Sequence, residues 1–351
     1  MRRLPPPSTD WLLLFIPISL AADLIGQPVL VFLTSALAIV PLADLIGRST
    51  EQVAIRLGPR MGGLLNATLG NITELIVAVL LISAGNFAIV KASLVGSIVG
   101  NLLLVLGIAF IVGGVRHEEQ QFSARAAGVH SASLLLAVAG LVVPALLILS
   151  TPDVGFVGKE VVSGVVAVVL IGLYLAAIAF TQVTHAHLFH APDREETPTW
   201  SQRRALLVLI VSAAFVGLES ELLVSSLTPA IETLRIPPLF VGLILIPVIG
   251  NAAEHGSAVV FAAKNRVDIT LEIAVGSSTQ IAMFLAPILV FISLAIGHPM
   301  DFVFNAFEVA IVFMATLIVA VISLDGRSNW LEGVQLFGAY IVIAAAAFFI
   351  R

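Results

Sequence analysis

The sequence predicts an all-α integral membrane protein with eleven transmembrane helices, and three observations lead to this fold class. Of the 351 residues, 59% are hydrophobic and only 11% are charged, whereas a soluble domain carries about 25% charged residues. Apolar stretches of the length that spans a bilayer as a helix, about 20 residues, follow one another along the chain. A short polar motif in the first half returns in the second half with matching surroundings.

The composition also excludes several classes of protein. A chain this poor in charge is neither a cytosolic enzyme nor a disordered scaffold. Its formal net charge of −5 provides no polycationic surface for a nucleic acid. The absence of cysteine excludes disulfides, thiolate catalysis and cysteine-based metal sites. We therefore expect the lipid bilayer as a partner, and no nucleic acid.

Charged or Pro/Gly-rich breaks delimit the predicted spans. The first is short, contains Pro17 and Asp23, and follows two arginines, so a cleaved signal peptide that leaves ten spans is the alternative to a retained helix. The longest gap, 183–203, is rich in histidine and acidic residues and is predicted to be a solvated linker. In order, the spans are 11–25, 28–47, 61–84, 88–113, 124–149, 160–182, 204–233, 239–263, 270–296, 303–323 and 331–350.

The basic residues predict the orientation of these spans. If the N-terminus is inside, all but four of the 17 lysines and arginines fall in inner segments, as the positive-inside rule requires. The exceptions are Lys91, Lys159, Arg235 and Arg351. We therefore expect the N-terminus in the cytoplasm and the C-terminus outside. The short loops and the absence of an additional targeting segment fit a prokaryotic plasma (inner) membrane.

The repeated motif is Gly-Asn-x-x-Glu, which ends at Glu74 in the third span and at Glu254 in the eighth. A Gly-Ser pair begins 22 residues after each glutamate, and a doubled motif with the same long-range spacing indicates duplication. The two spans run in opposite directions, so the halves form an inverted repeat with a substrate site near the middle of the bilayer. The predicted organisation is an N-terminal helix (1–26), a first five-helix repeat (27–183), a cytoplasmic linker (184–203) and a second five-helix repeat (204–351).

Glu74 and Glu254 lie nine or more residues from either end of their spans. An ionised carboxylate at the centre of a membrane helix costs about 2.5–3.5 kcal/mol on insertion scales. No lysine or arginine lies at comparable depth in any predicted span, which argues against a structural ion pair. The remaining candidates are metal ions and protons, and the alternative for the small polar residues nearby is helix packing.

Further polar residues surround the two glutamates in the sequence. Ser97 and Asn101 on the fourth span, with Ser277 and Gln280 on the ninth, offer hydroxyl and amide oxygens or serve in close packing. His255 follows Glu254 directly; it either relays protons or is a structural histidine.

A second pair of acids precedes the first pair by about 30 residues. Asp44 lies near the inner end of the second span and Glu221 in the outer part of the seventh, with an interfacial position as the alternative for each. Glu219 is two residues from Glu221 and faces elsewhere on the helix. Glu308, near the start of the tenth span, is predicted to line a vestibule.

These motifs resemble the two signature repeats of the calcium/proton exchanger (cation exchanger) family, within the cation/calcium exchanger superfamily. The similar segments are Gly62 to Ile76, Gly250 to His255 and Glu272 to Ala282. Members of the family are eleven-helix antiporters that move Ca²⁺ against H⁺. The resemblance implies that Glu74 and Glu254 are the central ion ligands, with Asn71, Asn251, Ser97, Ser277 and Gln280 in or beside the coordination shell.

The resemblance also assigns acids along the access route to Asp44 and Glu221. Two features depart from the family pattern: the first position is Asp rather than the usual Glu, and the linker has only three acids, Asp193, Glu195 and Glu196. The plain Gly-Asn-x-x-Glu argues against a sodium/calcium exchanger.

The functional prediction is a secondary antiporter that exchanges Ca²⁺ for H⁺ by alternating access. Ca²⁺ is a hard cation that takes 6–8 oxygen ligands, and two carboxylates brought close in a low-dielectric site accept either one divalent cation or protons. The alternatives are an Na⁺-driven cation/Ca²⁺ exchanger and a cation channel; an intramembrane enzyme is disfavoured because no nucleophile or third metal ligand accompanies Glu254 and His255. No cofactor is expected, and the sequence leaves a homo-oligomer open.

Overall fold

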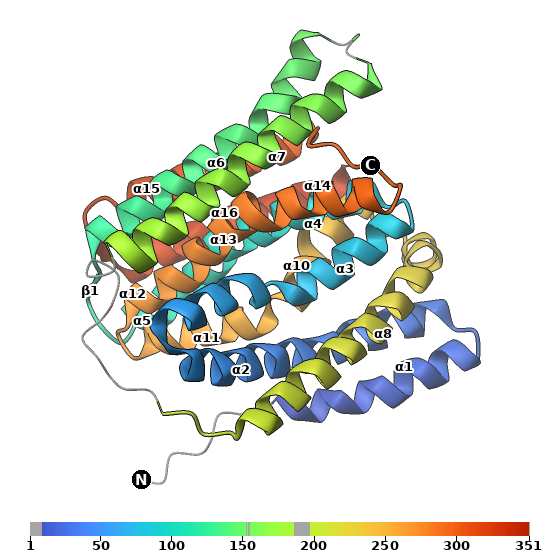
Figure 1. The fold of residues 1–351 in the computed structure, drawn as a ribbon, viewed down its shortest axis with the longest axis horizontal. Coiled ribbons are helices and arrows are strands. Elements are labelled where there is room, and N and C mark those ends of the chain that lie inside the picture. Colours follow the sequence, from blue (N-terminus) through green and yellow to red (C-terminus); the bar gives the residue numbers. More distant parts are fainter. Residues whose placement is uncertain (1–8, 152, 154, 186–196, 351) are drawn as a thin grey trace. The chain divides into compact units, whose positions relative to one another are not determined.

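The computed structural model describes residues 9–151, 153, 155–185 and 197–350, nearly all of them in helices (Figure 1). The helices divide into two compact units, and each contains segments from both halves of the chain. Unit 1 comprises Met1–Leu80, Glu196–Ile236 and Ile249–Ala253. Unit 2 comprises Leu81–Glu195, Pro237–Val248 and Glu254–Arg351.

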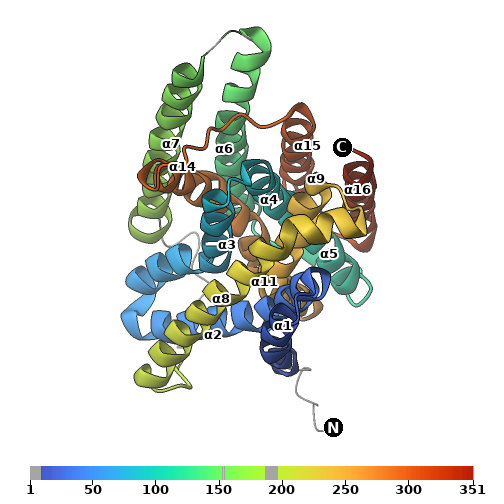
Figure 2. The same cartoon turned by 90° about the vertical axis from the view of Figure 1, so that its right-hand side faces the viewer.

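Unit 1 is built on the long helix α2, against which α1 and α8 pack (Figure 2). Its core joins Leu42 and Ile46 of α2 to Val216 of α8, with Ile16 of α1 packed against them. This burial of apolar side chains on α2 is what holds the helices together. The elements of the unit are η1 (Thr9–Leu14, a 3₁₀ helix), α1 (Phe15–Leu24), α2 (Pro28–Leu69), the start of α3 (Ile72–Ser83) and α8 (Gln202–Leu234).

Helix α2 is not one straight rod. Gly58 has φ of 78° and ψ of 171° inside it, a backbone conformation with positive φ that glycine adopts without the steric cost of a side chain. The helix is therefore kinked at Gly58. The part of α2 that is long and apolar enough to cross a membrane is Pro28–Gly58.

Unit 2 contains most of the remaining helices, several of which are interrupted by π-helical turns. Helix α5 packs against α16, and α6 against α15 and α7 (Figure 1). Its elements are α4 (Phe87–Val99), η2 (Gly100–Val105), α5 (Leu106–Gly114), α6 (Ala124–Ser150), α7 (Phe156–Ala179), η3 (Phe180–Thr184), α9 (Pro238–Phe240), η5 (Val241–Leu245), α10 (Ile246–Gly250, which ends in unit 1), α11 (Ala252–Ala263, which begins in unit 1), α12 (Val267–Leu271), η6 (Glu272–Gly276), α13 (Ser277–Gln280), η7 (Ile281–Leu285), α14 (Ala286–Ala295), α15 (Ala306–Ile322) and α16 (Trp330–Phe349).

Two short strands and several side-chain caps fix the helix ends in these units. Strand β1 (Gln120–Gln121) pairs antiparallel with β2 (Arg327–Ser328), and Gln120 lies opposite Ser328. A side-chain oxygen of the residue before a helix accepts a backbone N–H of the first turn and so satisfies a donor that has no partner within the helix. Helices α6, α8, α15 and α16 are capped in this way by Ser123, Ser201, Asn305 and Asn329.

The described part of the chain has seven helices that are long and apolar enough to cross a membrane, or eight if the bent pair α9–α11 is one span. The first predicted span corresponds to the short η1 and α1, and the tenth to α15, which has 17 residues. The third is interrupted between α2 and α3. The prediction of an all-α membrane protein is confirmed, and the number eleven stays a prediction.

Candidate ion-binding site

Both copies of the Gly-Asn-x-x-Glu motif lie where a helix is interrupted. Helix α2 ends at Leu69 and α3 begins at Ile72. The chain bends by 63° between the segment ending at Gly250 and α11, which begins at Ala252. Interrupted membrane helices of this kind adjoin the ion sites of transporters.

Each glutamate lies in the first turn of the helix that follows its break. Glu74 is in the first turn of α3, and Glu254 in the first turn of α11. The positive end of a helix dipole stabilises a negatively charged side chain there. Each break therefore places a carboxylate at the start of a helix, and carboxylate oxygens suit a hard cation.

The two motifs share their local structure as well as their sequence. Helices α3 and α11 both have 12 residues. Each ends in a turn with a left-handed residue, Gly85 with φ of 77° and Asn265 with φ of 58°. Both residues lie at the same distance along the chain from their glutamate.

In unit 1 the first glutamate lies against the second motif. A Cβ atom placed on Gly250 would be 3.6 Å from Cγ of Glu74 and 4.0 Å from its Oε1. Asn71 and Asn251, which belong to the same unit, are both buried. The glycine that begins the second motif therefore gives the Glu74 side chain room beside the backbone.

In unit 2 the second glutamate is held by a serine that the sequence analysis singled out. Ser277 Oγ donates a hydrogen bond to Glu254 Oε2 at 2.9 Å, and the serine is buried. Ser277 follows the π-helical turn η6, and Gln280 precedes the next one, η7. Ser97 is buried near the end of α4, just before the π-helical turn η2.

His255 has a partner that the sequence analysis did not assign to it. Its Nε2 lies 3.2 Å from Oδ1 of Asn101 in η2, and Asn101 is buried. Within the described residues, Asn101 Nδ2 makes no hydrogen bond. The two residues are far apart in the sequence, so only the tertiary structure reveals that they meet.

Three π-helical turns adjoin the candidate ligands of unit 2. Such wide turns displace hydrogen bonds from the i→i+4 pattern and recur at functional sites. No residue type marks them in the sequence. They are η2, η6 and η7, which lie directly after α4, before Ser277 and after Gln280.

Replacing Ser277 by alanine tests the contact with Glu254. The carboxylate loses a hydrogen-bond donor that fixes its position, and such changes around a metal ligand cost about 10–100-fold in affinity. We expect equilibrium binding of ⁴⁵Ca²⁺ to weaken by roughly tenfold or more. Ser278→Ala is the matched control, because Ser278 Oγ donates to the Ala274 carbonyl of its own helical segment, at 2.8 Å. Equal affinity in the Ser277→Ala and control proteins would contradict the assignment.

The second pair of acids has two different environments. Asp44 Oδ2 lies 2.7 Å from Nη2 of Arg48, which also contacts Asp10 Oδ1 at 2.9 Å. Glu221 is exposed on α8. Glu219, which the sequence analysis set aside, is fully buried on the same helix.

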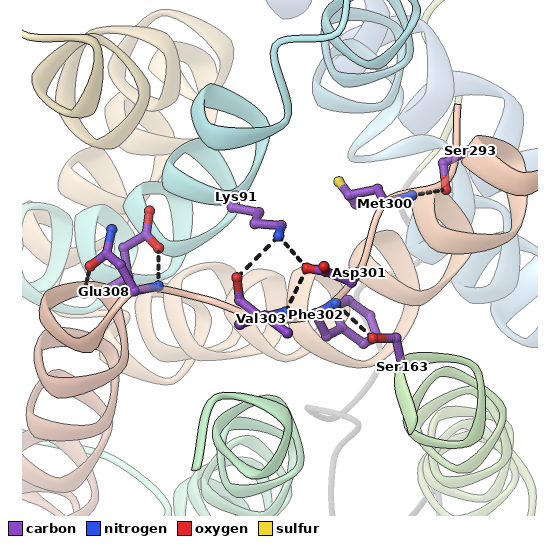
Figure 3. A network of polar contacts seen from close by, with 9 residues as sticks. Lys91, Ser163, Ser293, Met300, Asp301, Phe302, Val303 and Glu308 are labelled. Atoms are coloured by element: carbon purple, nitrogen blue, oxygen red, sulfur yellow. Dashed lines mark hydrogen bonds and ion pairs between the residues drawn. The ribbon is translucent and has the colours of Figure 1, made fainter. Parts of the chain in front are cut away.

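Glu308 begins helix α15 as part of a capping box. Asn305 N donates to Glu308 Oε2, and Glu308 N donates to Asn305 Oδ1, both at 2.9 Å (Figure 3). The capping box accounts for the place of Glu308 in the first turn of α15, and its role at a vestibule stays a prediction.

Lys91 anchors the segment before α15. Its Nζ forms an ion pair with Asp301 and donates to the Val303 carbonyl at 3.0 Å (Figure 3). Asp301 also accepts a hydrogen bond from Val303 N at 3.0 Å. These contacts fix the path of the chain between α14 and α15.

Comparison with known proteins adds to this geometry. A family model described as sodium/calcium exchanger protein matches residues 27–183 and 204–349. A protein of Synechocystis sp. named Ca(2+)/H(+) antiporter is 44% identical over 360 residues, which cover 96% of each chain. A Ca(2+)/H(+) antiporter of Aphanothece halophytica is 45% identical over 358 residues, with 96% of this chain and 95% of that protein covered.

A solved structure also matches the fold. The structure of native YfkE superposes with a TM-score of 0.86 at 36% sequence identity, and the match covers 97% of this chain and 100% of that chain.

Proposed function

This chain belongs to the sodium/calcium exchanger protein family, and we propose that it is a secondary antiporter that exchanges Ca²⁺ for H⁺ across a membrane. The observation that carries the proposal is the pair of interrupted helices that place Glu74 and Glu254 in matching first turns. The names of the relatives from Synechocystis sp. and Aphanothece halophytica support the choice of Ca²⁺ and H⁺.

Glu74 and Glu254 are proposed to share one ion near the middle of the bilayer. Support comes from unit 1, where Gly250, four residues before Glu254, lies against Glu74. Ser277 orients Glu254, and His255, held by Asn101, is proposed to pass protons to and from Glu254. The proposed oxygen shell is completed by Asn71, Asn251, Ser97 and Gln280.

This donor set explains why Ca²⁺ and protons compete. Ca²⁺ takes 6–8 oxygen ligands in flexible geometry, which carboxylate, amide, hydroxyl and backbone carbonyl oxygens can provide together. An empty pair of neighbouring carboxylates in a low-dielectric site is costly, because charge is desolvated and like charges repel. Either one divalent cation or protons remove that cost. Exposure of the site to one side at a time then couples the two fluxes.

The proposed topology is an N-terminal helix followed by two inverted five-helix repeats, eleven spans in all. The family model supports it by matching the chain in two segments separated at 184–203, the predicted cytoplasmic linker. We place the N-terminus in the cytoplasm and the C-terminus outside on the distribution of lysine and arginine. The short loops favour a prokaryotic plasma membrane as the location.

The driving ion is tested with the purified protein in proteoliposomes. Uptake of ⁴⁵Ca²⁺ is compared under an imposed pH gradient, an imposed sodium gradient and neither. We expect Ca²⁺ to be taken up against its own concentration gradient only when the pH gradient is imposed. Uptake driven by sodium alone would identify an Na⁺-driven exchanger, and downhill flux without proton movement would identify a channel.

Glu221 is proposed to lie on the access route, together with Asp44. Because Glu221 is exposed rather than part of the oxygen shell, Glu221→Ala is expected to slow ΔpH-driven uptake several-fold while equilibrium ⁴⁵Ca²⁺ binding stays within about twofold. Uptake rate and binding are measured on the same preparation, with Glu232→Ala as the control at an exposed position of the same helix. A loss of binding would instead place Glu221 among the ligands.

A further inference from the structure

Glu219 is a buried carboxyl group that the proposed exchange does not use. It lies on α8 in unit 1 with 0% of its surface exposed. One turn before it, Val216 belongs to the apolar cluster with Leu42 and Ile46. One turn after it, Leu222 belongs to a second cluster. The carboxyl group is therefore enclosed by apolar packing between α1, α2 and α8.

The two contacts of Ser19 exceed the one hydrogen that its hydroxyl can donate when Glu219 is ionised. Ser19 Oγ, on α1, lies 2.9 Å from Glu219 Oε1 and 2.8 Å from the carbonyl oxygen of Ile16. A serine hydroxyl has one hydrogen to donate, and both of these neighbours are acceptors when the carboxyl group is ionised. If Glu219 carries a proton, its O–H donates to Ser19 Oγ while Ser19 donates to Ile16, and both contacts are satisfied.

No charged side chain offsets an ionised Glu219 in the described part of the chain. Arg48, on the packed helix α2, is engaged with Asp10 and Asp44, and Glu219 forms no ion pair with any described residue. Apart from Glu219, the exposed acids on the helices of this unit are Asp10 on η1, Asp23 on α1, Glu51 on α2, and Glu221 and Glu232 on α8. Asp44 on α2 and Glu74 on α3 are half-buried.

The second oxygen of the carboxyl group points to the same protonation state. Glu219 Oε2 is buried and makes no hydrogen bond to any described residue. Burying an ionised carboxylate that has one donor at most is far costlier than burying the neutral acid. Geometry, packing and charge thus agree on a neutral Glu219.

We propose that Glu219 is a proton-binding site separate from the Glu74 and Glu254 pair, and that its bound proton docks α1 onto α8. The proton completes a chain of hydrogen bonds from Glu219 through Ser19 to Ile16. Removing it leaves a buried anion that competes with the Ile16 carbonyl for the single hydrogen of Ser19, so α1 separates from α8 at alkaline pH. The proposal concerns the contact between two helices and does not depend on which ion the protein transports.

The test uses a single thiol, because the chain has no cysteine. Ala22 is 2% exposed on α1 and packs with Val31 and Leu222, so an Ala22→Cys thiol is protected while α1 is docked. Its reaction with a water-soluble maleimide is followed in proteoliposomes from neutral to alkaline pH. The same reporter is measured with Glu219→Gln, whose amide is neutral at every pH and can donate to Ser19. The ratio of the two rates cancels the ionisation of the thiol itself.

We expect labelling at alkaline pH to be at least about tenfold faster with the native Glu219 than in the Glu219→Gln protein, and the two rates to be equal at neutral pH. Glu232→Gln, the same change at an exposed position of α8, is expected to leave the pH profile unchanged. Identical profiles for the Glu219 and Glu219→Gln proteins would overturn the proposal.

Two further measurements keep the test decisive if Glu219→Gln does not fold. Ser19→Ala removes the acceptor of the Glu219 proton, and α1 is then expected to be released at lower pH; an unchanged profile contradicts the proposal. At neutral pH, the protonated Glu219 is expected to contribute to the infrared carbonyl band of carboxylic acids. As the pH is raised, this band is expected to lose intensity in Ser19→Ala at a pH where Glu232→Gln still retains it. A band of equal intensity in both proteins at every pH would contradict the role of Ser19 in holding the proton.

Discussion

Glu74→Gln and Glu254→Gln are each expected to abolish Ca²⁺ uptake driven by a pH gradient. Glutamine keeps the size and one oxygen of the side chain but carries no charge and cannot exchange a proton. Removing one charge from a buried group of opposite charges that balance one another costs about 3–5 kcal/mol. Each 1.4 kcal/mol is a factor of about ten in an equilibrium constant. We therefore expect at least about a hundredfold loss of ⁴⁵Ca²⁺ affinity, with uptake in proteoliposomes at the level of empty vesicles.

The control for these two variants is Glu232→Gln, which makes the same change at an exposed position of α8. Expression, size-exclusion profile and thermal unfolding of the purified proteins establish that the two variants are folded. Robust ΔpH-driven uptake by either folded variant would refute the shared site. Loss of uptake with intact Ca²⁺ binding would assign the residue to proton coupling alone.

Gly96→Ala is expected to disrupt unit 2 and with it transport. A Cβ atom on Gly96 would overlap the carbonyl oxygen of Leu243 and lie 2.7 Å from both the Leu243 carbonyl carbon and Cγ of Pro247. Backbone atoms cannot rotate away as a flexible side chain does, so α4 must move off the segment that leads to Glu254. Overpacking of this kind costs roughly 1–3 kcal/mol, and more where backbone must shift.

The measurement is the thermal unfolding midpoint in detergent together with the initial rate of ΔpH-driven uptake, and both are expected to fall. Gly164→Ala is the matched control, since Gly164 lies inside helix α7 and a Cβ atom there meets nothing within 4 Å. That control is expected to be neutral or slightly stabilising, because alanine favours the helix. An unchanged unfolding midpoint and uptake rate in Gly96→Ala would mean that α4 does not contact the segment of Leu243 and Pro247 as described.

The membrane class and the two glutamate motifs could be predicted because they depend on local sequence. Apolar stretches long enough to span a bilayer indicate burial in lipid. The duplicated Gly-Asn-x-x-Glu identifies Glu74 and Glu254 without any tertiary information. The structure places both at helix breaks. The glycine of each motif gave the signal for a break, since glycine weakens a helix.

Contacts between distant segments could not be predicted in the same way. The partner of His255 is Asn101, and that of Glu219 is Ser19; nothing in the local sequence of either pair specifies the other member. Helical spacing placed Glu219 and Glu221 on different faces, and the prediction favoured Glu221. Which face of α8 meets α1 and α2 depends on packing, and that packing buries Glu219 instead.

The π-helical turns around α13 have a consequence for engineering this protein. A four-residue α-helical segment, Ser277–Gln280, lies between η6 and η7, so its orientation depends on how many residues each wide turn absorbs. In an ordinary helix, deleting one residue rotates everything beyond it by about 100°. Here a deletion within Glu272–Gly276 can convert the wide turn to regular geometry, and the register beyond it is then retained. A single-residue deletion in this segment is therefore expected to leave the ligands beyond it in place, whereas the same deletion would misorient them in an uninterrupted helix.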